Sequence, residues 1–121
     1  MTAAVSEAVR HLGVVSKNYE KLASDYQEIA IAAAEAEADY RKEKAKAMLV
    51  AMSDGASAAK AEALANGDDR IAEICRQYKI TAALADSARA KLTQLREQVA
   101  VGRSMMVAER ESDRIHAASA P

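Results

Sequence analysis

The chain has 121 residues, the size of one domain, and its 17 basic residues nearly balance its 18 acidic ones. Half of the residues count as hydrophobic, but 30 residues are alanines, which bury little area and cannot build a large core. One Pro and four Gly provide few turns, which argues against a β-sandwich, a barrel or a βαβ fold. The composition instead predicts an all-α protein made of long helices.

The first predicted elements are a short helix over residues 3–12 and a long helix over residues 18–52. Gly13, together with Ser16 and Asn18, favours a break between these two helices. The long helix is expected to stop just before Gly55, because a glycine at the end of a helical pattern can take the left-handed conformation that closes a helix.

The second half of the chain begins with a short predicted helix and continues with a long one. Ser57 has the side chain of an N-cap, and Gly67 follows the short helix as its stop. Asp68 or Asp69 then caps the long helix. The predicted boundaries are 57–66 for the short helix, 69–115 for the long helix and 116–121 for a frayed tail.

Apolar residues recur at alternating spacings of three and four along both long helices. An average spacing of 3.5 residues places them on one side of a helix and is typical of a coiled-coil seam. We call the two series the first and the second seam. The first seam contains Tyr19, Leu22, Tyr26, Ile29, Ala33, Ala36 and Tyr40, and the second contains Ile71, Ile74, Tyr78, Thr81, Ala85, Ala88, Leu92, Leu95, Val99, Gly102 and Met106.

The two long helices are expected to pair as a helical hairpin or bundle within a single domain that spans residues 1–121. Large apolar side chains are too few for a sizeable core in a monomer. Small seam residues let helices approach closely, which favours an interface shared between subunits. We therefore expect a homo-oligomer of more than two subunits, with its interface at Tyr19, Leu22, Tyr26, Ile29, Tyr40, Ile71, Ile74, Tyr78, Leu92, Leu95 and Val99.

The sequence contains no pattern that predicts a catalytic or metal centre. Asp113 and His116 have the i, i+3 spacing of bundle metal sites, but di-iron bundles need two such pairs and carboxylates from four helices. Cys75 adjoins the seam residue Ile74 and has no nearby His, which predicts a packing role. We expect no enzymatic activity, no cofactor and no metal.

The cellular compartment is also suggested by the sequence. A single cysteine excludes an internal disulfide framework and fits a reducing compartment. We find neither a secretory signal nor an apolar run of the roughly 18 residues that a membrane span needs. The expected location is therefore the cytoplasm, without membrane attachment.

Charged residues are segregated along the chain. Residues 25–39 contain five acidic residues and no basic one, and a basic strip of Arg41, Lys42, Lys44 and Lys46 follows. This basic strip is either a solvated face, with Asp39 and Glu43 as its i, i+3 and i, i+4 partners, or a phosphate-binding surface that an oligomer would multiply. The second interpretation assigns nucleic-acid contacts to Arg41, Lys42, Lys44 and Lys46, supported by Arg76, Lys79, Arg89 and Lys91.

Residues 31–55 combine an acidic stretch, a basic stretch and a closing glycine in one predicted helix. This stretch resembles the UvsY-type recombination mediators of bacteriophages, which are small all-helical proteins. The family has a Leu-Lys-Ala-Arg-Leu segment implicated in binding single-stranded DNA, and the matching residues here are Ala45-Lys46-Ala47-Met48-Leu49. Lys46 matches a basic residue of that segment and Met48 does not, so a second basic contact would come from Lys42 or Lys44.

The resemblance implies a non-enzymatic protein that assembles into rings and holds single-stranded DNA on a basic surface. It further implies a mediator that helps to load a recombinase onto strands covered by single-strand binding protein. Since all four tyrosines fall on the seams, we expect DNA binding to depend on phosphates and not on base stacking. The alternative is a structural or scaffolding coiled-coil adaptor, such as a phage assembly component, that binds a partner helix and has no nucleic-acid role.

Overall fold

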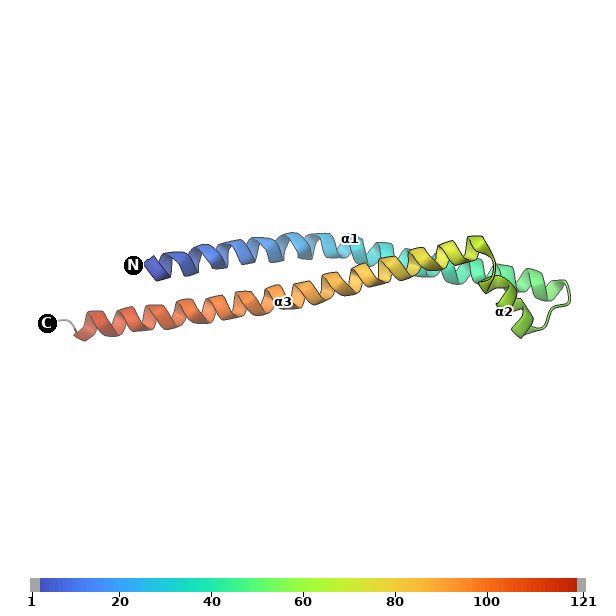
Figure 1. Ribbon diagram of the computed structural model, residues 1–121. Helices are drawn as coiled ribbons and strands as arrows, with labels where there is room; N and C mark the ends of the chain where they lie inside the picture. Colours follow the sequence, from blue (N-terminus) through green and yellow to red (C-terminus); the bar gives the residue numbers. More distant parts are fainter. Residues whose placement is uncertain (1–2, 120–121) are drawn as a thin grey trace. The chain divides into compact units, whose positions relative to one another are not determined.

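The computed structural model describes residues 3–119 as three α-helices joined by two short turns (Figure 1). Helix α1 spans Ala3–Ser53, α2 spans Ala58–Asn66 and α3 spans Asp69–Ser119. The described residues contain no strand, and the all-α prediction is confirmed. No helix within residues 3–119 is long and apolar enough to cross a membrane.

Two helix boundaries correct the sequence-based expectations. Helix α1 runs through Gly13 without a break, so the predicted helices 3–12 and 18–52 are one element. An interior glycine costs a helix only about 1 kcal/mol relative to alanine, which a helix of this length tolerates. Helix α3 continues to Ser119 instead of fraying from residue 116, because alanine has the highest helix propensity. The final two residues of the predicted tail lie outside the described residues.

The turns on either side of α2 agree with the sequence-based prediction. Gly55 has a φ of 101°, a left-handed conformation that favours glycine. The Ser57 hydroxyl accepts a hydrogen bond from the backbone N–H of Lys60 at 3.3 Å and caps α2. Asp68 caps α3, since its Oδ1 accepts from the backbone N–H groups of Arg70 at 2.9 Å and Ile71 at 3.1 Å.

The chain divides into two compact units, and the single domain expected over residues 1–121 stays a prediction. Unit 1 consists of Met1–Asp25 and Arg89–Pro121, and unit 2 consists of Tyr26–Ala88. Both α1 and α3 pass from one unit into the other, so each unit contains a segment of each long helix.

In unit 1, the segments of α1 and α3 pack against each other through a small number of apolar residues. Val15 of α1 and Leu95 of α3 are buried. Gly102 lies against Leu12, because a Cβ atom placed on this glycine would stand 3.0 Å from Leu12 Cδ1. The absence of a side chain at residue 102 therefore allows the close approach of Leu12.

In unit 2, α2 and its two turns reverse the chain so that the start of α3 lies beside α1 at Glu43, before the last turns of α1 (Figure 1). The rings of Tyr40 and Tyr78 stack with their centroids 5.5 Å apart and their planes 16° apart. The buried apolar residues are mostly small, which makes the core of this unit thin. They are Ala61, Ala65, Ile71, Ala85 and Ala88.

Residues of both predicted seams lie on the less exposed sides of their helices. All residues of the first seam are partly buried, and those of the second seam are partly or fully buried. The stacking of Tyr40 on Tyr78 joins the two seams within one chain. Their predicted place at an interface between subunits stays a prediction.

Candidate interaction site

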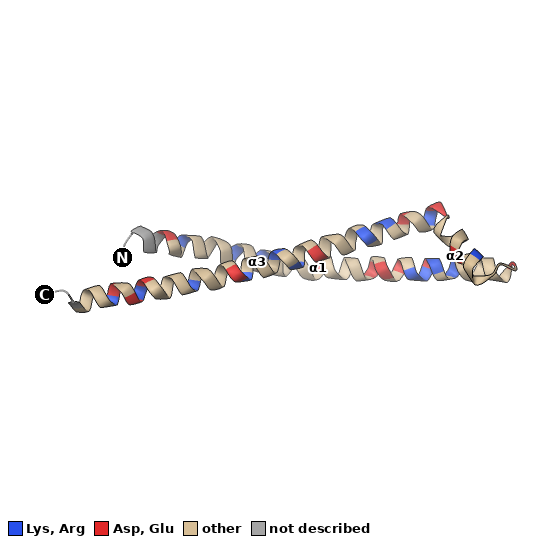
Figure 2. Cartoon of the chain, turned by 60° about the horizontal axis from the view of Figure 1, so that its bottom comes forward, with Lys and Arg blue, Asp and Glu red and all other residues tan. Residues whose placement is uncertain are grey.

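The basic strip follows the acidic stretch on the part of α1 that belongs to unit 2 (Figure 2). Two of its side chains pair with carboxylates on the same helix. Arg41 Nη2 lies 2.6 Å from Glu37 Oε1, and Lys46 Nζ lies 3.8 Å from Glu43 Oε1. The spacing of four and three residues within one helix could have predicted both pairs.

Lys44 is held between two helices of unit 2. Its Nζ donates a hydrogen bond of 3.4 Å to Glu62 Oε1 on α2 and lies 5.8 Å from the centroid of the Tyr40 ring. Desolvation lowers the pKa of Lys44, but the charge and hydrogen-bond interactions with Tyr40 and Glu62 outweigh it, so the pKa lies above the ordinary 10.5. Lys44 therefore contributes to the contact between α1 and α2, a role that sequence reasoning missed.

Glu43 forms a second cross-helix contact beside the basic strip. Its Oε2 lies 3.0 Å from Arg70 Nη1 at the start of α3, and its other carboxylate oxygen faces Lys46. No local pattern in the sequence predicts the pairing of Glu43 with Arg70, because it depends on the turns that bring α3 back to α1.

The remaining predicted nucleic-acid contacts are divided between the two units. In unit 2, Lys42 and Lys79 are exposed and have no ion pair among the described residues, and Arg76 lies 3.5 Å from Glu73. Arg89 and Lys91 belong to unit 1. Unit 2 contains 8 basic and 11 acidic residues, so the basic strip lies in a unit of net negative charge.

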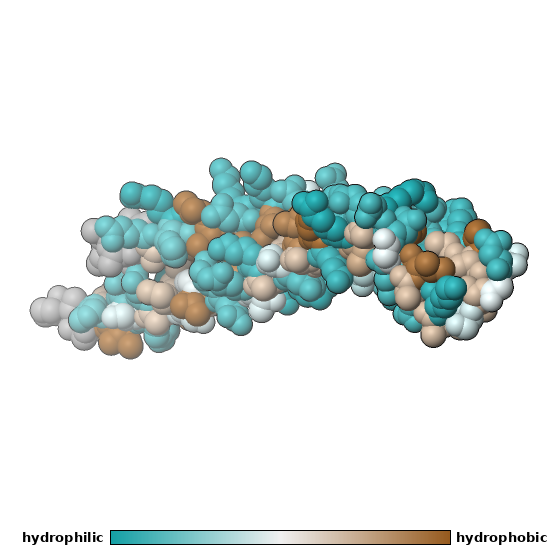
Figure 3. Space-filling model, turned by 45° about the vertical axis from the view of Figure 1, so that its right-hand side comes forward, coloured by the Kyte–Doolittle hydropathy of each residue, from teal (hydrophilic) through white to brown (hydrophobic). Residues whose placement is uncertain are grey.

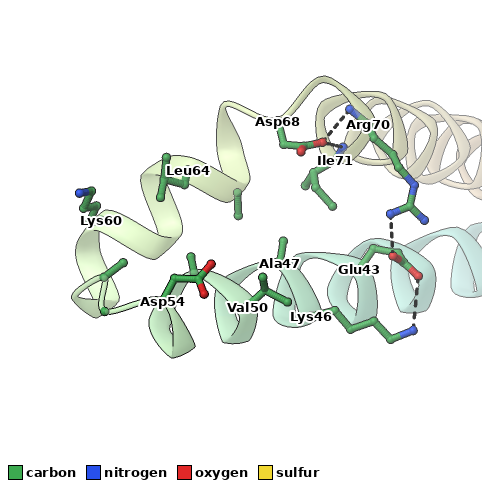
Figure 4. A pocket seen from close by; sticks show the side chains of 14 residues that line it. Glu43, Lys46, Ala47, Val50, Asp54, Lys60, Leu64, Asp68, Arg70 and Ile71 are labelled. Atoms are coloured by element: carbon green, nitrogen blue, oxygen red, sulfur yellow. Dashed lines mark hydrogen bonds and ion pairs between the residues drawn. The ribbon is translucent and has the colours of Figure 1, made fainter.

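A groove of about 720 Å³ lies between the end of α1, helix α2 and the start of α3, all within unit 2 (Figure 4). We call it the tip groove. Its lining combines small or branched apolar residues with charged ones. The apolar residues are Ala47, Val50, Ala51, Ala56, Leu64, Ala65 and Ile71, and the charged ones are Glu43, Lys46, Asp54, Lys60, Asp68 and Arg70.

Large apolar side chains are exposed around the tip groove. Leu49, Val50 and Met52 at the end of α1 retain 68%, 64% and 45% of their accessible surface, and Leu64 of α2 retains 54%. We call these four residues the apolar tip, and Figure 3 shows hydrophobic surface at this end of unit 2. The segment 47–66 that carries them has only three charged residues in twenty, Asp54, Lys60 and Glu62.

Two observations on the described residues concern metal binding and cysteine chemistry. No group of three or more His, Cys, Asp or Glu side chains within residues 3–119 is arranged to hold a metal ion. Cys75 is partly buried and lines a shallow depression on α3 with Arg76, Lys79 and Ile80. The expected absence of catalysis, cofactor and metal stays a prediction.

Comparison with known proteins finds no matching family model, curated protein or solved structure for this chain. The resemblance of residues 31–55 to UvsY-type mediators stays a prediction. Within that stretch, the geometry assigns Lys44 to the Glu62 contact and leaves Lys42 without an ion pair among the described residues.

Proposed function

We propose that this chain is a non-enzymatic assembly protein, a structural or scaffolding adaptor whose unit 2 packs against another helical surface. The observation that carries the proposal is the apolar tip, four large side chains that stay exposed in a segment with few charges. Two of them, Val50 and Leu64, line the same groove. Exposed apolar surface marks interaction sites, and the centres of interfaces are depleted of charge.

The thin core supports the same proposal. Val15, Ile71 and Leu95 are the only large side chains among the described buried residues, and the others are alanines. Burial of so little apolar area offsets only a small part of the conformational entropy that the chain loses on folding. A partner that binds only the folded chain would add its binding free energy to the stability of the fold.

The assembly proposal is tested by measuring mass and melting temperature together. We expect light scattering to give a mass above that of the monomer, and the melting temperature to rise with protein concentration from about 1 to about 100 μM. Leu49→Ser with Val50→Ser should reduce both effects, whereas Ile31→Ser, at a half-exposed residue elsewhere on α1, should not. A monomer with a constant melting temperature would contradict the proposal.

A second candidate function is binding of single-stranded DNA, with a role as a phage-type mediator that helps to load a recombinase. The specific support is that Lys42 and Lys79 are exposed and lack ion pairs among the described residues. Arg41 is exposed too, and a surface ion pair is worth about 0–1 kcal/mol, so phosphate can replace its Glu37 partner. Repetition of these residues over the subunits of an oligomer would add affinity through avidity.

Fluorescence anisotropy with a labelled oligonucleotide tests the DNA-binding candidate. We expect log K to fall with log salt at about 0.7 for each phosphate contacted, and homopolymers to differ by less than about 1 kcal/mol because Tyr40 and Tyr78 stack on each other. Lys42→Glu with Lys79→Glu should remove binding. The control, Lys17→Glu with Arg110→Glu, has the same charge change in unit 1 and should retain it.

Absence of binding in low salt would refute the DNA-binding candidate, since electrostatic attraction is strongest there. Equal losses in the two double variants would also contradict it, because they would show a response to net charge alone. Neither result would affect the assembly proposal, which rests on the apolar tip.

A further inference from the structure

We propose that the partner of unit 2 is a second copy of this chain, docked on the tip groove in a two-fold arrangement that pairs Asp54 of each copy with Lys60 of the other. The inference rests on the proposed assembly function and names its partner. It is carried by the charges of the tip groove, by its apolar lining and by the surface area that the chain leaves exposed.

Most charged side chains of the tip groove already have partners within the chain. Glu43 faces both Arg70 and Lys46, and Asp68 accepts two backbone hydrogen bonds at the start of α3. Asp54 and Lys60 differ, since neither side chain has an ion pair among the described residues. Figure 4 shows Asp54 at the end of α1 and Lys60 on α2, on the two sides of the turn that joins these helices.

An acidic and a basic side chain that have no ion pair within the chain can pair with their counterparts in a second copy across a two-fold axis. In such an interface, residue i of one subunit meets residue j of the other, and j meets i, so a single Asp and a single Lys form two ion pairs. A nucleic acid fits this surface poorly, because Glu43, Asp54 and Asp68 line the same groove. A strongly basic partner would meet Lys46, Lys60 and Arg70 there.

The apolar side chains also suit a second copy. Val50 and Leu64 line the tip groove and retain 64% and 54% of their accessible surface. Alanines at residues 47, 51, 56 and 65 leave the groove open for the large side chains of a partner. In a two-fold arrangement of facing grooves, Val50 and Leu64 of one copy would therefore enter the tip groove of the other.

The exposed area of the chain is sufficient for such an interface. The accessible surface is 8749 Å², whereas a compact monomer of the same 12.9 kDa exposes about 6,300 Å². The excess of about 2,400 Å² is greater than the about 800 Å² that each partner buries in an interface of standard size. The chain therefore exposes more area than one interface of standard size covers.

Charge exchange at the two residues tests the proposal. Asp54→Lys alone and Lys60→Glu alone each place like charges opposite one another twice per dimer, and each should weaken association at least tenfold. The double variant with both changes restores opposite charges and should associate within about threefold of the natural chain. Sedimentation velocity at one fixed ionic strength measures these affinities, because salt screens exposed charges.

Mixing the two single variants gives the sharpest result. The Asp54→Lys chain presents two bases at the interface and the Lys60→Glu chain presents two acids, so both contacts between unlike chains join opposite charges. The mixture should therefore form heterodimers in preference to either homodimer in native mass spectrometry.

Neither Asp54→Lys nor Lys60→Glu should unfold the chain, so a loss of association in these variants would report on the interface. Glu is favoured at the third residue of α2, and a basic residue is favoured after the end of α1. Circular dichroism checks the helicity of each variant. Lys79→Glu has the same charge change as Lys60→Glu and is a control that should leave association unchanged.

The outcomes separate this inference from the assembly function. If the chain associates but neither exchange alters its affinity, or the double variant does not recover, the two-fold docking at the tip groove is wrong and the assembly proposal stands. A chain that stays monomeric at all concentrations would overturn both.

Discussion

Unit 1 and unit 2 join the same two long helices by different means. In unit 1, Leu12 lies against Gly102, and the buried residues Val15 and Leu95 have large side chains. Unit 2 buries mainly alanines and adds polar contacts between helices, Lys44 with Glu62 and Glu43 with Arg70. The aromatic pair of Tyr40 and Tyr78 also lies in unit 2.

This difference shows how an alanine-rich sequence can still define one arrangement of helices. Alanine lets helices approach but contributes little apolar area and few directional contacts. The cross-helix ion pairs of unit 2 are individually weak, since solvent screens partly exposed charges, but they favour one register. Stability in both units should therefore depend on the few large buried side chains.

Replacement of the largest buried side chain of unit 2 gives the largest expected effect. Ile71 is 3% exposed, and Ile71→Ala should lower the free energy of unfolding by about 2–5 kcal/mol through lost burial and a residual cavity. Ile31→Ala, at a residue that is 50% exposed on α1, is the matched control and should cost less than about 1 kcal/mol. Urea unfolding measures both, and similar losses would show that the core of unit 2 is not centred on Ile71.

The local features of the fold were predictable from the sequence, because they depend on residues a few places apart. The left-handed conformation at Gly55 and the caps at Ser57 and Asp68 each follow from one side chain or its absence. The break at Gly13 was predicted by the same local logic and is wrong. A glycine weakens a helix without ending it when apolar residues on both sides, such as Leu12 and Val15, are held by contacts with another helix.

The candidate site was predictable only in part. The segregation of acidic and basic residues on α1 is visible in the sequence, and so is the Glu37–Arg41 pair. The contact of Lys44 with Glu62 joins residues 18 places apart and depends on the turn at Gly55. The tip groove could not be predicted for the same reason, because its lining comes from three helices that the turns bring together.

Two glycines of unit 1 provide a smaller test of how its helices meet. No atom lies within 4 Å of a Cβ placed on Gly13, so Gly13→Ala should stabilise the chain by about 0.5–1 kcal/mol through helix propensity alone. Gly102→Ala should gain less or destabilise, because its Cβ would stand 3.0 Å from Leu12 Cδ1 and displace that side chain. Thermal melts of both variants give the difference, and equal gains would mean that Leu12 does not rest on Gly102 in solution.

The smallest expected effect belongs to the polar contacts of unit 2. A raised pKa means that folding favours the charged form of Lys44, so its contribution is fully present below pH 10.5 and is lost as the pH rises through the higher folded value. A double-mutant cycle of Lys44→Gln and Glu62→Gln should therefore give a favourable coupling at neutral pH that disappears in this alkaline range. The cycle of Arg76→Gln and Glu73→Gln is the control, since both residues lie on α3 and arginine keeps its charge at alkaline pH. Its small coupling should persist above pH 10.5, provided that circular dichroism shows the chain still folded there. A coupling of Lys44 with Glu62 that also persisted there would contradict charge as the origin of this contact between α1 and α2.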